Sequence, residues 1–331
     1  MQDNSMQGDY FLYEFVTGGG LYAWREPPGG PLLAEGLAML RAVCEDFQRA
    51  NCRPRLLWDA RLPIPPPAGA DVARIETAQQ ERREFLRHSR EAAAALVIAP
   101  ELQGALLERC RWVEEAGGRL LSPDSRFVEL AADKWKTLML WRQDAPRPGG
   151  LCGPQPPPPA AYPLIVKPRD GAGSHEVLRV DSPRQWPTFG EERMWEPFYP
   201  GEAVSAAVLC SRRKRIALPA CRQHLETGGF QYLGGETPLP LERDRRARAA
   251  ALAALRNFPP TQGYVGVDLV LGENPDGSED VAIEVNPRLT TSYIGLRQAL
   301  EGNFSQAMMQ AAEDRLQPLD FHPRRIAFQA T

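Results

Sequence analysis

Short apolar runs and stretches of helical spacing alternate along the first part of the chain. The runs at residues 10–16 and 95–99 are typical of strands, and 56–59 is a shorter strand candidate. Residues 32–50 and 102–116 instead repeat apolar side chains at the spacing of a helix. Strands that alternate with helices favour a parallel sheet covered on both faces. We therefore expect an α/β fold class, beginning with an N-terminal parallel-sheet α/β domain.

The pattern changes around residues 145–163, where proline and glycine dominate and we expect a loop. A helix is expected before this loop, over residues 125–141. Short apolar runs after it predict strands at 164–167, 177–180, 194–198 and 203–209. Two further helices are expected over 243–255 and 305–312.

Near the C-terminal end, two apolar runs flank a Pro-Asp-Gly turn, which predicts an antiparallel hairpin. With the turn centred near Asp276, Asp268 and Glu284 fall opposite each other, and Asn286 shares the face of Glu284. Facing carboxylates repel and should destabilise a strand pair. A divalent cation bound between the carboxylates would replace this repulsion with attraction, and hard oxygen ligands suit Mg²⁺. The hairpin therefore predicts a magnesium site of the kind that serves nucleotide phosphates.

Two lysines are candidates for contacting those phosphates. Lys167 ends an apolar strand, and a glycine-rich loop reaching Ser174 follows it at once. Glycines let backbone N–H groups approach an anion closely, and the lysine adds positive charge. An ordinary turn with a solvated lysine is an equal alternative for this segment alone. Lys134 lies near the start of a helix, where Asp133 reads as a helix-start residue; taken alone, Lys134 is a surface residue.

A third segment joins a strand to a Pro-Gly turn and carries Glu196, Phe198 and, beyond the turn, Glu202. Taken alone, a glutamate after a turn is a solvated residue, but an extended connection can offer backbone groups to a base and a carboxylate to a ribose. Glu101, which follows Ala99-Pro100, reads as a helix cap or a substrate contact, and the sequence favours the cap.

Composition narrows the classes of partner. The chain has 331 residues and a net charge of −3, which argues against a general nucleic-acid-binding surface. No apolar run approaches the ~20 residues that cross a bilayer, and the polar first residues lack the order of a secretory signal. Six cysteines are scattered without a Cys-x-x-Cys pair, which fits reduced thiols. We expect a cytoplasmic protein with no membrane or nucleic-acid partner, and a homodimer stays open.

The order of these segments resembles the ATP-grasp superfamily, whose two lobes clamp ATP between them. That order is a lysine, a lysine with a glycine loop, a Glu-x-Phe connector, and an aspartate paired with Glu-x-Asn-Pro-Arg. The resemblance implies a domain of the pre-ATP-grasp kind over 1–123, followed by a two-lobed ATP-grasp fold. Its small lobe would span 124–200, and its large lobe, with the metal site, 201–331.

Within the superfamily, the chain resembles the tyramine–L-glutamate ligases of methanofuran-type cofactor synthesis. The residues that carry this likeness are 99–101, 167–173, 222–223, 232–235 and 286–296. The implied activity is an ATP-dependent ligation, through an acyl phosphate, of the side-chain carboxyl of L-glutamate to an aromatic amine, tyramine or tyrosine. Two alternatives remain: another amino-acid or dipeptide ligase, and a nucleotide-binding regulator without turnover.

The resemblance also implies roles for single residues. Catalysis would fall to Arg288 and Lys167. ATP would be bound by Lys134, Lys167, Gly171, Gly173, Ser174, Glu196, Phe198 and Glu202. Mg²⁺, with Mn²⁺ as an alternative, would be bound by Asp268, Glu284 and Asn286. The acceptor pocket would draw on Arg222, Gln223, Tyr232, Thr290, Thr291, Ser292 and Tyr293, for each of which a structural role is an equal alternative.

Overall fold

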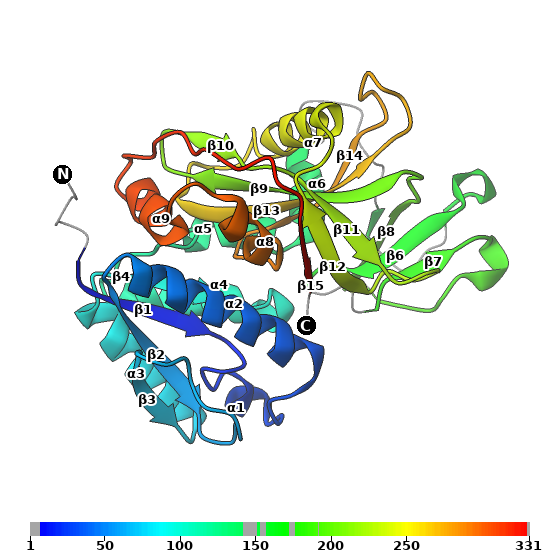
Figure 1. Ribbon diagram of the computed structural model, residues 1–331. Coiled ribbons are helices and arrows are strands. Elements are labelled where there is room, and N and C mark those ends of the chain that lie inside the picture. Colours follow the sequence, from blue (N-terminus) through cyan, green and yellow to red (C-terminus); the bar gives the residue numbers. More distant parts are fainter. Residues whose placement is uncertain (1–6, 142–150, 153–156, 172–175, 191, 330–331) are drawn as a thin grey trace.

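The N-terminal part of the chain is a parallel α/β domain, as its apolar pattern predicts. The computed structural model describes residues 7–141, 151–152, 157–171, 176–190 and 192–329. The elements of this domain are β1 (Asp9–Glu14), α1 (Leu21–Trp24), α2 (Gly30–Arg49), β2 (Arg53–Asp59), β3 (Asp71–Ile75), α3 (Ala78–Glu91), β4 (Ala94–Ile98), the 3₁₀ turn η2 (Leu102–Gly104) and α4 (Ala105–Glu115). The strands lie in the order β3-β2-β1-β4, and the pairs are parallel (Figure 1).

The central strands β1 and β4 of this sheet are almost entirely buried, which fits their mostly apolar sequences. Leu12 of β1 packs in one core with Phe47 of α2. Its neighbours Phe11 and Tyr13 point to the other face, where their rings lie 5.0 and 4.8 Å from that of Phe85 in α3. Successive side chains of a strand alternate between faces. One short run of apolar residues therefore fills two helix–sheet cores.

The second half of the chain contains a large antiparallel sheet. Its elements are β9 (Glu202–Cys210), β10 (Arg215–Ala217), β11 (Cys221–Leu225), β12 (Tyr232–Thr237), α7 (Leu241–Ala254), β13 (Gly263–Leu271), β14 (Val281–Asn286), α8 (Ser292–Ala299), α9 (Phe304–Ala312) and β15 (Ile326–Gln329). The strand order is β14-β13-β9-β11-β12-β15, with β10 paired to β9. Alanines of α7 pack on one face, and α8 and α9 belong to the core on the other.

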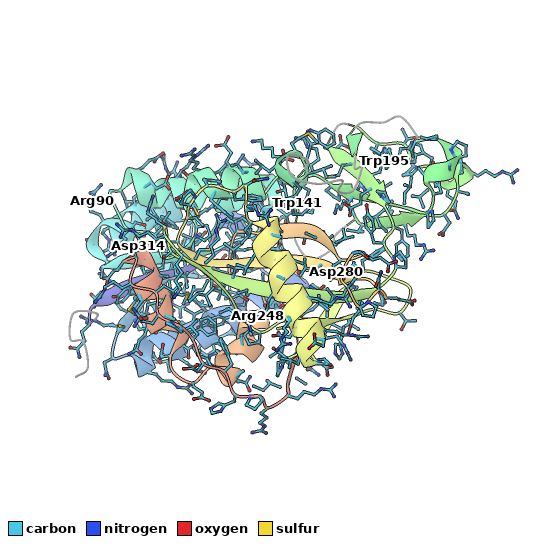
Figure 2. The ribbon with its side chains drawn as sticks, turned by 90° about the horizontal axis from the view of Figure 1, so that it is seen from above. Arg90, Trp141, Trp195, Arg248, Asp280 and Asp314 are labelled. Carbon is cyan, nitrogen blue, oxygen red and sulfur yellow. The ribbon has the colours of Figure 1, made fainter. Side chains whose placement is uncertain are left out.

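A smaller antiparallel sheet lies beside the large one (Figure 1). Its segment contains α5 (Ser125–Ala131), α6 (Lys134–Trp141), β5 (Leu151–Cys152), the 3₁₀ turn η3 (Pro159–Ala161), β6 (Leu164–Pro168), β7 (Leu178–Val180), the 3₁₀ turn η4 (Pro183–Gln185) and β8 (Arg193–Pro197). The strand order is β5-β8-β6-β7. Figure 2 shows Trp195 in this outlying sheet and Trp141 beside α7, where Trp141 Nε1 donates to Ala254 O at 2.8 Å. That bond fastens the end of α6 to the end of α7.

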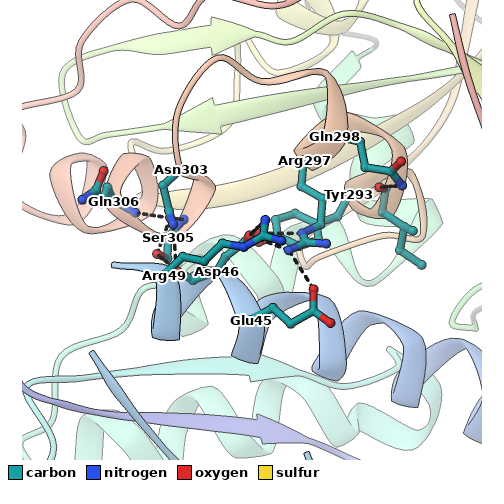
Figure 3. Close-up of polar contacts among 10 residues, drawn as sticks. Glu45, Asp46, Arg49, Tyr293, Arg297, Gln298, Asn303, Ser305 and Gln306 are labelled. Atoms are coloured by element: carbon teal, nitrogen blue, oxygen red, sulfur yellow. Dashed lines mark hydrogen bonds and ion pairs between the residues drawn. The ribbon is translucent and has the colours of Figure 1, made fainter. Parts of the chain in front are cut away.

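Asp46 of helix α2 connects the N-terminal domain to helices α8 and α9 of the second half of the chain. Asp46 accepts hydrogen bonds from Tyr293 Oη at 2.5 Å and Arg297 Nη2 at 2.7 Å, both on α8 (Figure 3). Its backbone carbonyl accepts further bonds from Asn303 and Ser305 at the start of α9. Asp46 is only 4% exposed, so this buried hydrogen-bond network fastens α2 to α8 and α9.

One sequence expectation about these elements is wrong. The helix expected over 125–141 is two helices, because Asp133 Oδ1 accepts the amides of Trp135 and Lys136 and starts a new helix. The parallel sheet expected for the N-terminal domain is confirmed, and among the described strands the two sheets beyond it are antiparallel. The hairpin connections beyond residue 160 are too short for parallel crossovers. No described helix has the length and apolarity needed to span a membrane.

Candidate functional site

A cavity of about 470 Å³ lies between the two antiparallel sheets. Strands β6 and β8 supply Lys167 and Glu196 to its wall, and β13 and β14 supply Asp268 and Glu284. Glu35 of α2 also lines it, so the N-terminal domain and both antiparallel sheets contribute residues to the cavity. A cleft that buries both polar and apolar groups between layers is the usual form of a small-molecule site.

The two acidic residues of the hairpin face each other across β13 and β14. Asp268 and Glu284 are register partners in the antiparallel ladder, as the sequence predicts, and a bulge follows Asp268. Asp268 accepts hydrogen bonds from Gln223 Nε2 and from Asn286 Nδ2, both at 2.9 Å. These four side chains therefore form one connected polar group within the cavity wall.

The surrounding charges shift the pKa values of the two carboxylates in opposite directions. Burial, and then repulsion from Glu284, raises the pKa of Asp268. Burial opposes ionisation of Glu284 as well, but the positive charges of Lys134 and Lys167 prevail and hold its pKa below the usual value. Lys134 Nζ lies 3.2 Å from Glu284 Oε2 and donates to Gly171 O, also at 3.2 Å. Lys134 thus connects the acidic hairpin to the glycine-rich loop.

Lys167 is held by a different acid. Its Nζ lies 2.5 Å from Glu196 Oε1 and 3.4 Å from Ile283 O, and both side chains are almost fully buried. The sequence assigns Glu196 only a backbone contact with a base. The structure shows that its side chain orients Lys167, a partnership that no local spacing predicts because the two residues are on neighbouring strands.

Arg288 pairs with the N-terminal domain. Its Nε donates to Glu101 Oε1 at 2.9 Å and Oε2 at 3.1 Å. The cap interpretation favoured for Glu101 is therefore wrong: η2 has no side-chain cap from this residue, whose carboxylate turns toward the cavity-lining arginine. A single acid before a short helix carries no sequence signal that distinguishes these two roles.

The residues expected to bind substrate fall into two groups. Gln223, Tyr232, Thr290, Thr291 and Ser292 line the cavity. Among described side chains, those of Arg222 and Tyr293 do not. Arg222 pairs with Glu202 and Glu236, because neighbours on β11 point to opposite sides of the sheet. Tyr293 instead donates to Asp46, in the interface that Figure 3 shows.

The residues expected to bind nucleotide are also divided. Gly171 and Phe198 line the cavity, whereas Glu202, which does not, pairs with Arg222 and Arg243. The amide of Phe198 donates to Pro163 O at 2.9 Å, so this backbone donor is already used. Gly173 and Ser174 lie outside the described residues, and so does most of the proline-rich segment before Pro157.

The cavity lining also includes residues that the sequence analysis did not single out. Glu35, Arg179, Leu225 and Phe230 come from a helix, two strands and a loop. The Arg179 guanidinium lies 4.2 Å from the centre of the Phe198 ring, which is a cation–π contact. Glu35 and Arg179 lie outside the segments that carry the resemblance, and only the packing of helix α2 and strand β7 brings them to this cavity.

The donor set of the hairpin fits a magnesium ion shared with a nucleotide. No group of three or more histidine, cysteine, aspartate or glutamate residues with metal-binding geometry occurs in the part of the chain that the structure describes. Two carboxylates and an amide oxygen do not fill the coordination shell of a magnesium ion. Mg²⁺ is commonly held by one or two carboxylates together with substrate phosphates and water. Asp268, Glu284 and Asn286 match that arrangement.

Comparison with known proteins identifies two domain families in the chain. Residues 131–292 match the model of an ATP-grasp domain, and residues 52–128 match a pre-ATP-grasp domain. A tyramine–L-glutamate ligase from Methanocaldococcus fervens is 27% identical over 203 residues. That alignment covers 61% of this chain and 61% of the relative, less than two thirds of its length.

Solved structures share the fold. An ATP-grasp superfamily protein from Archaeoglobus fulgidus superposes with a TM-score of 0.73 at 21% identity, covering 97% of this chain and 92% of that one. An N5-carboxyaminoimidazole ribonucleotide synthetase in complex with ADP gives a TM-score of 0.70 at 14% identity, covering 97% and 80%. By its match to an ATP-grasp domain and to the pre-ATP-grasp domain before it, the chain belongs to the ATP-grasp superfamily.

Proposed function

We propose that the protein is an ATP-dependent ligase that joins a carboxylate to an amine through an acyl phosphate, releasing ADP and phosphate. The observation that carries this proposal is the grouping of Lys134, Lys167 and Arg288 around the Asp268–Glu284 pair in one cavity. Positive charge beside a two-carboxylate cation site suits the transfer of a phosphoryl group between anions.

Each residue then has a defined task. Lys134 and Lys167 would hold the ATP phosphates, Lys167 being oriented by Glu196. Asp268, Glu284 and Asn286 would hold Mg²⁺, which offsets negative charge while a carboxylate approaches the γ-phosphorus. Arg288, fixed by Glu101, would bind that carboxylate or the transferred phosphoryl group. An amine then attacks the acyl phosphate, the C–N bond forms, and phosphate leaves.

The preferred substrates are L-glutamate, through its side-chain carboxyl, and an aromatic amine such as tyramine or tyrosine, as in methanofuran-type cofactor synthesis. The named relative supports this choice. Phe230 and Tyr232 in the cavity wall are suited to contact an aromatic ring. The proposed acceptor site therefore combines these rings with the hydroxyls of Thr290, Thr291 and Ser292.

An activity screen tests the proposal. The purified chain is given ATP and Mg²⁺ with pairwise combinations of amino acids and amines, and ADP release and product mass are measured. We expect ADP release that requires both glutamate and an aromatic amine, and a product equal in mass to the two minus water. Another active pair would support a different amino-acid or dipeptide ligase. Tight ATP binding without turnover in any combination would support a regulatory nucleotide-binding protein.

A further inference from the structure

We propose that Glu35 is the catalytic base of the amine half-reaction: it binds the acceptor as its ammonium ion and removes the proton that blocks attack. This inference rests on the proposed ligase function and assigns the acceptor chemistry to a helix of the N-terminal domain. The ligand class is a primary aliphatic ammonium, which is the reacting group of tyramine.

Glu35 lies within the candidate site. It lies in the second turn of α2 and lines the cavity that contains the acidic hairpin. Arg288, which pairs with Glu101, lines the same cavity, and its charge acts on Glu35. The Asp46 network anchors α2 against α8 and α9, so Glu35 is presented from a rigid element.

The other acidic residues that line the cavity already have hydrogen-bond or ion-pair partners. Glu196 pairs with Lys167, Glu284 pairs with Lys134, and Asp268 accepts bonds from Gln223 and Asn286. Asp170 accepts the backbone amide of Gln103 at 3.1 Å.

Glu35 differs from these acids. It is half-buried, and it makes no hydrogen bond or close ion pair with any described residue. A carboxylate in a cavity without such a partner is available to a cationic ligand. Burial raises the pKa of Glu35, against the opposing charge of Arg288, and this makes the group a better proton acceptor.

The chemistry balances without a further reagent. The ammonium ion gives one proton to the Glu35 carboxylate and becomes a neutral amine. Its lone pair attacks the carbonyl carbon of the acyl phosphate, the C–N bond forms, and the C–O bond to phosphate breaks. The leaving phosphate takes the bonding electrons, and the second amine proton passes to it. Glu35 then releases its own proton to solvent.

A change of nucleophile separates this role from a structural one. Hydroxylamine is uncharged at neutral pH and needs no base before it attacks an acyl phosphate. ADP release and hydroxamate formation are measured with glutamate and hydroxylamine, and ADP release with glutamate and the aromatic amine, for wild type and Glu35→Gln. We expect kcat/KM for the amine to fall about 100-fold in Glu35→Gln, with the hydroxylamine reaction close to wild type.

A matched variant controls for changes in α2. Glu45→Gln alters an exposed acid on the same helix that pairs with Arg297 away from the cavity, and it should leave both reactions unchanged. An unchanged amine reaction in Glu35→Gln would overturn the proposal, and so would an equal loss of both reactions. A wild-type protein inactive with either nucleophile would overturn the ligase function itself, and this inference with it.

Discussion

Arg288 donates through Nε to both carboxylate oxygens of Glu101, at 2.9 and 3.1 Å, although 187 residues separate them in sequence. The side chains of Arg288 and Glu101 are 14% and 3% exposed. The contact ties the segment that follows β14, whose last residue is the proposed metal ligand Asn286, to the N-terminal domain. It makes the geometry of the candidate site depend on how the two halves of the chain pack.

Replacing Glu101 with glutamine should therefore destabilise the protein. The substitution leaves the Arg288 charge without its buried partner, and we expect a loss of about 3 kcal/mol in the free energy of unfolding. Urea unfolding of Glu101→Gln and wild type measures this difference. As a control, Glu129→Gln breaks an exposed pair with Arg111 and should change stability by less than about 1 kcal/mol. Equal stability of all three proteins would contradict the buried pairing.

The two acids of the hairpin should respond differently to neutralisation. Repulsion alone predicts that losing either charge relieves strain when no metal is added. Because Lys134 pairs with Glu284, however, Glu284→Gln leaves a largely buried ammonium uncompensated and should lower stability by about 1–3 kcal/mol. Asp268→Asn keeps polar contacts, since the amide of Gln223 can rotate to accept, and should match or exceed wild-type stability.

Both hairpin variants should lose activity even though their stabilities differ. Each removes a charge from the proposed cation site, and turnover should fall about 100-fold or more. Metal-free thermal unfolding and ADP release are measured side by side for the two variants. Near-normal turnover in either one would contradict the assignment of the metal ligands.

The stability of the protein should depend on pH through Glu14. This buried carboxylate accepts bonds from the amides of Val16 and Thr17 and from the Thr17 hydroxyl, yet burial still raises its pKa from 4.5 to about 7. Between these values the folded state holds a proton that the unfolded chain has lost. Raising the pH through this window should therefore remove roughly 3 kcal/mol of stability from this group.

Glutamine at position 14 tests that linkage. Glu14→Gln cannot ionise, so its unfolding free energy should lack this decline between about pH 4.5 and 7. Glu273→Gln, at an exposed site, should keep the wild-type slope. A Glu14→Gln slope identical to wild type would show that the buried carboxyl does not titrate in this range.

Magnesium should stabilise the protein strongly only when nucleotide is present. The hairpin offers two carboxylates and an amide, so the remaining ligands would come from phosphates and water. We expect a small change of Tm with Mg²⁺ alone. With a non-hydrolysable ATP analogue at about 100 Kd, the added stability should reach about 2.7 kcal/mol. The full shift with Mg²⁺ alone, or an equal shift with the analogue and a chelator, would argue against a shared site.

Local pattern was enough to predict several parts of this protein. The strand β1, the helices α2 and α4, and the hairpin of β13 and β14 follow from apolar spacing and turn residues. It was not enough for β10, β11 and β12, whose short segments contain charged and small residues. The single helix expected over 125–141 was also wrong, because the capping bonds of Asp133 override a continuous helical pattern.

The sequence by itself determined that Asp268 faces Glu284, because strand side chains repeat every two residues and the turn sets which pairs meet. It also determined the family, through the order of its lysine, glycine and acidic motifs. Only the tertiary structure decided that Lys134 pairs with Glu284, that Glu196 orients Lys167, and that α2 delivers Glu35 to the cavity. Those relationships arise where separate layers pack, and the spacing of residues within one element carries no information about its neighbours.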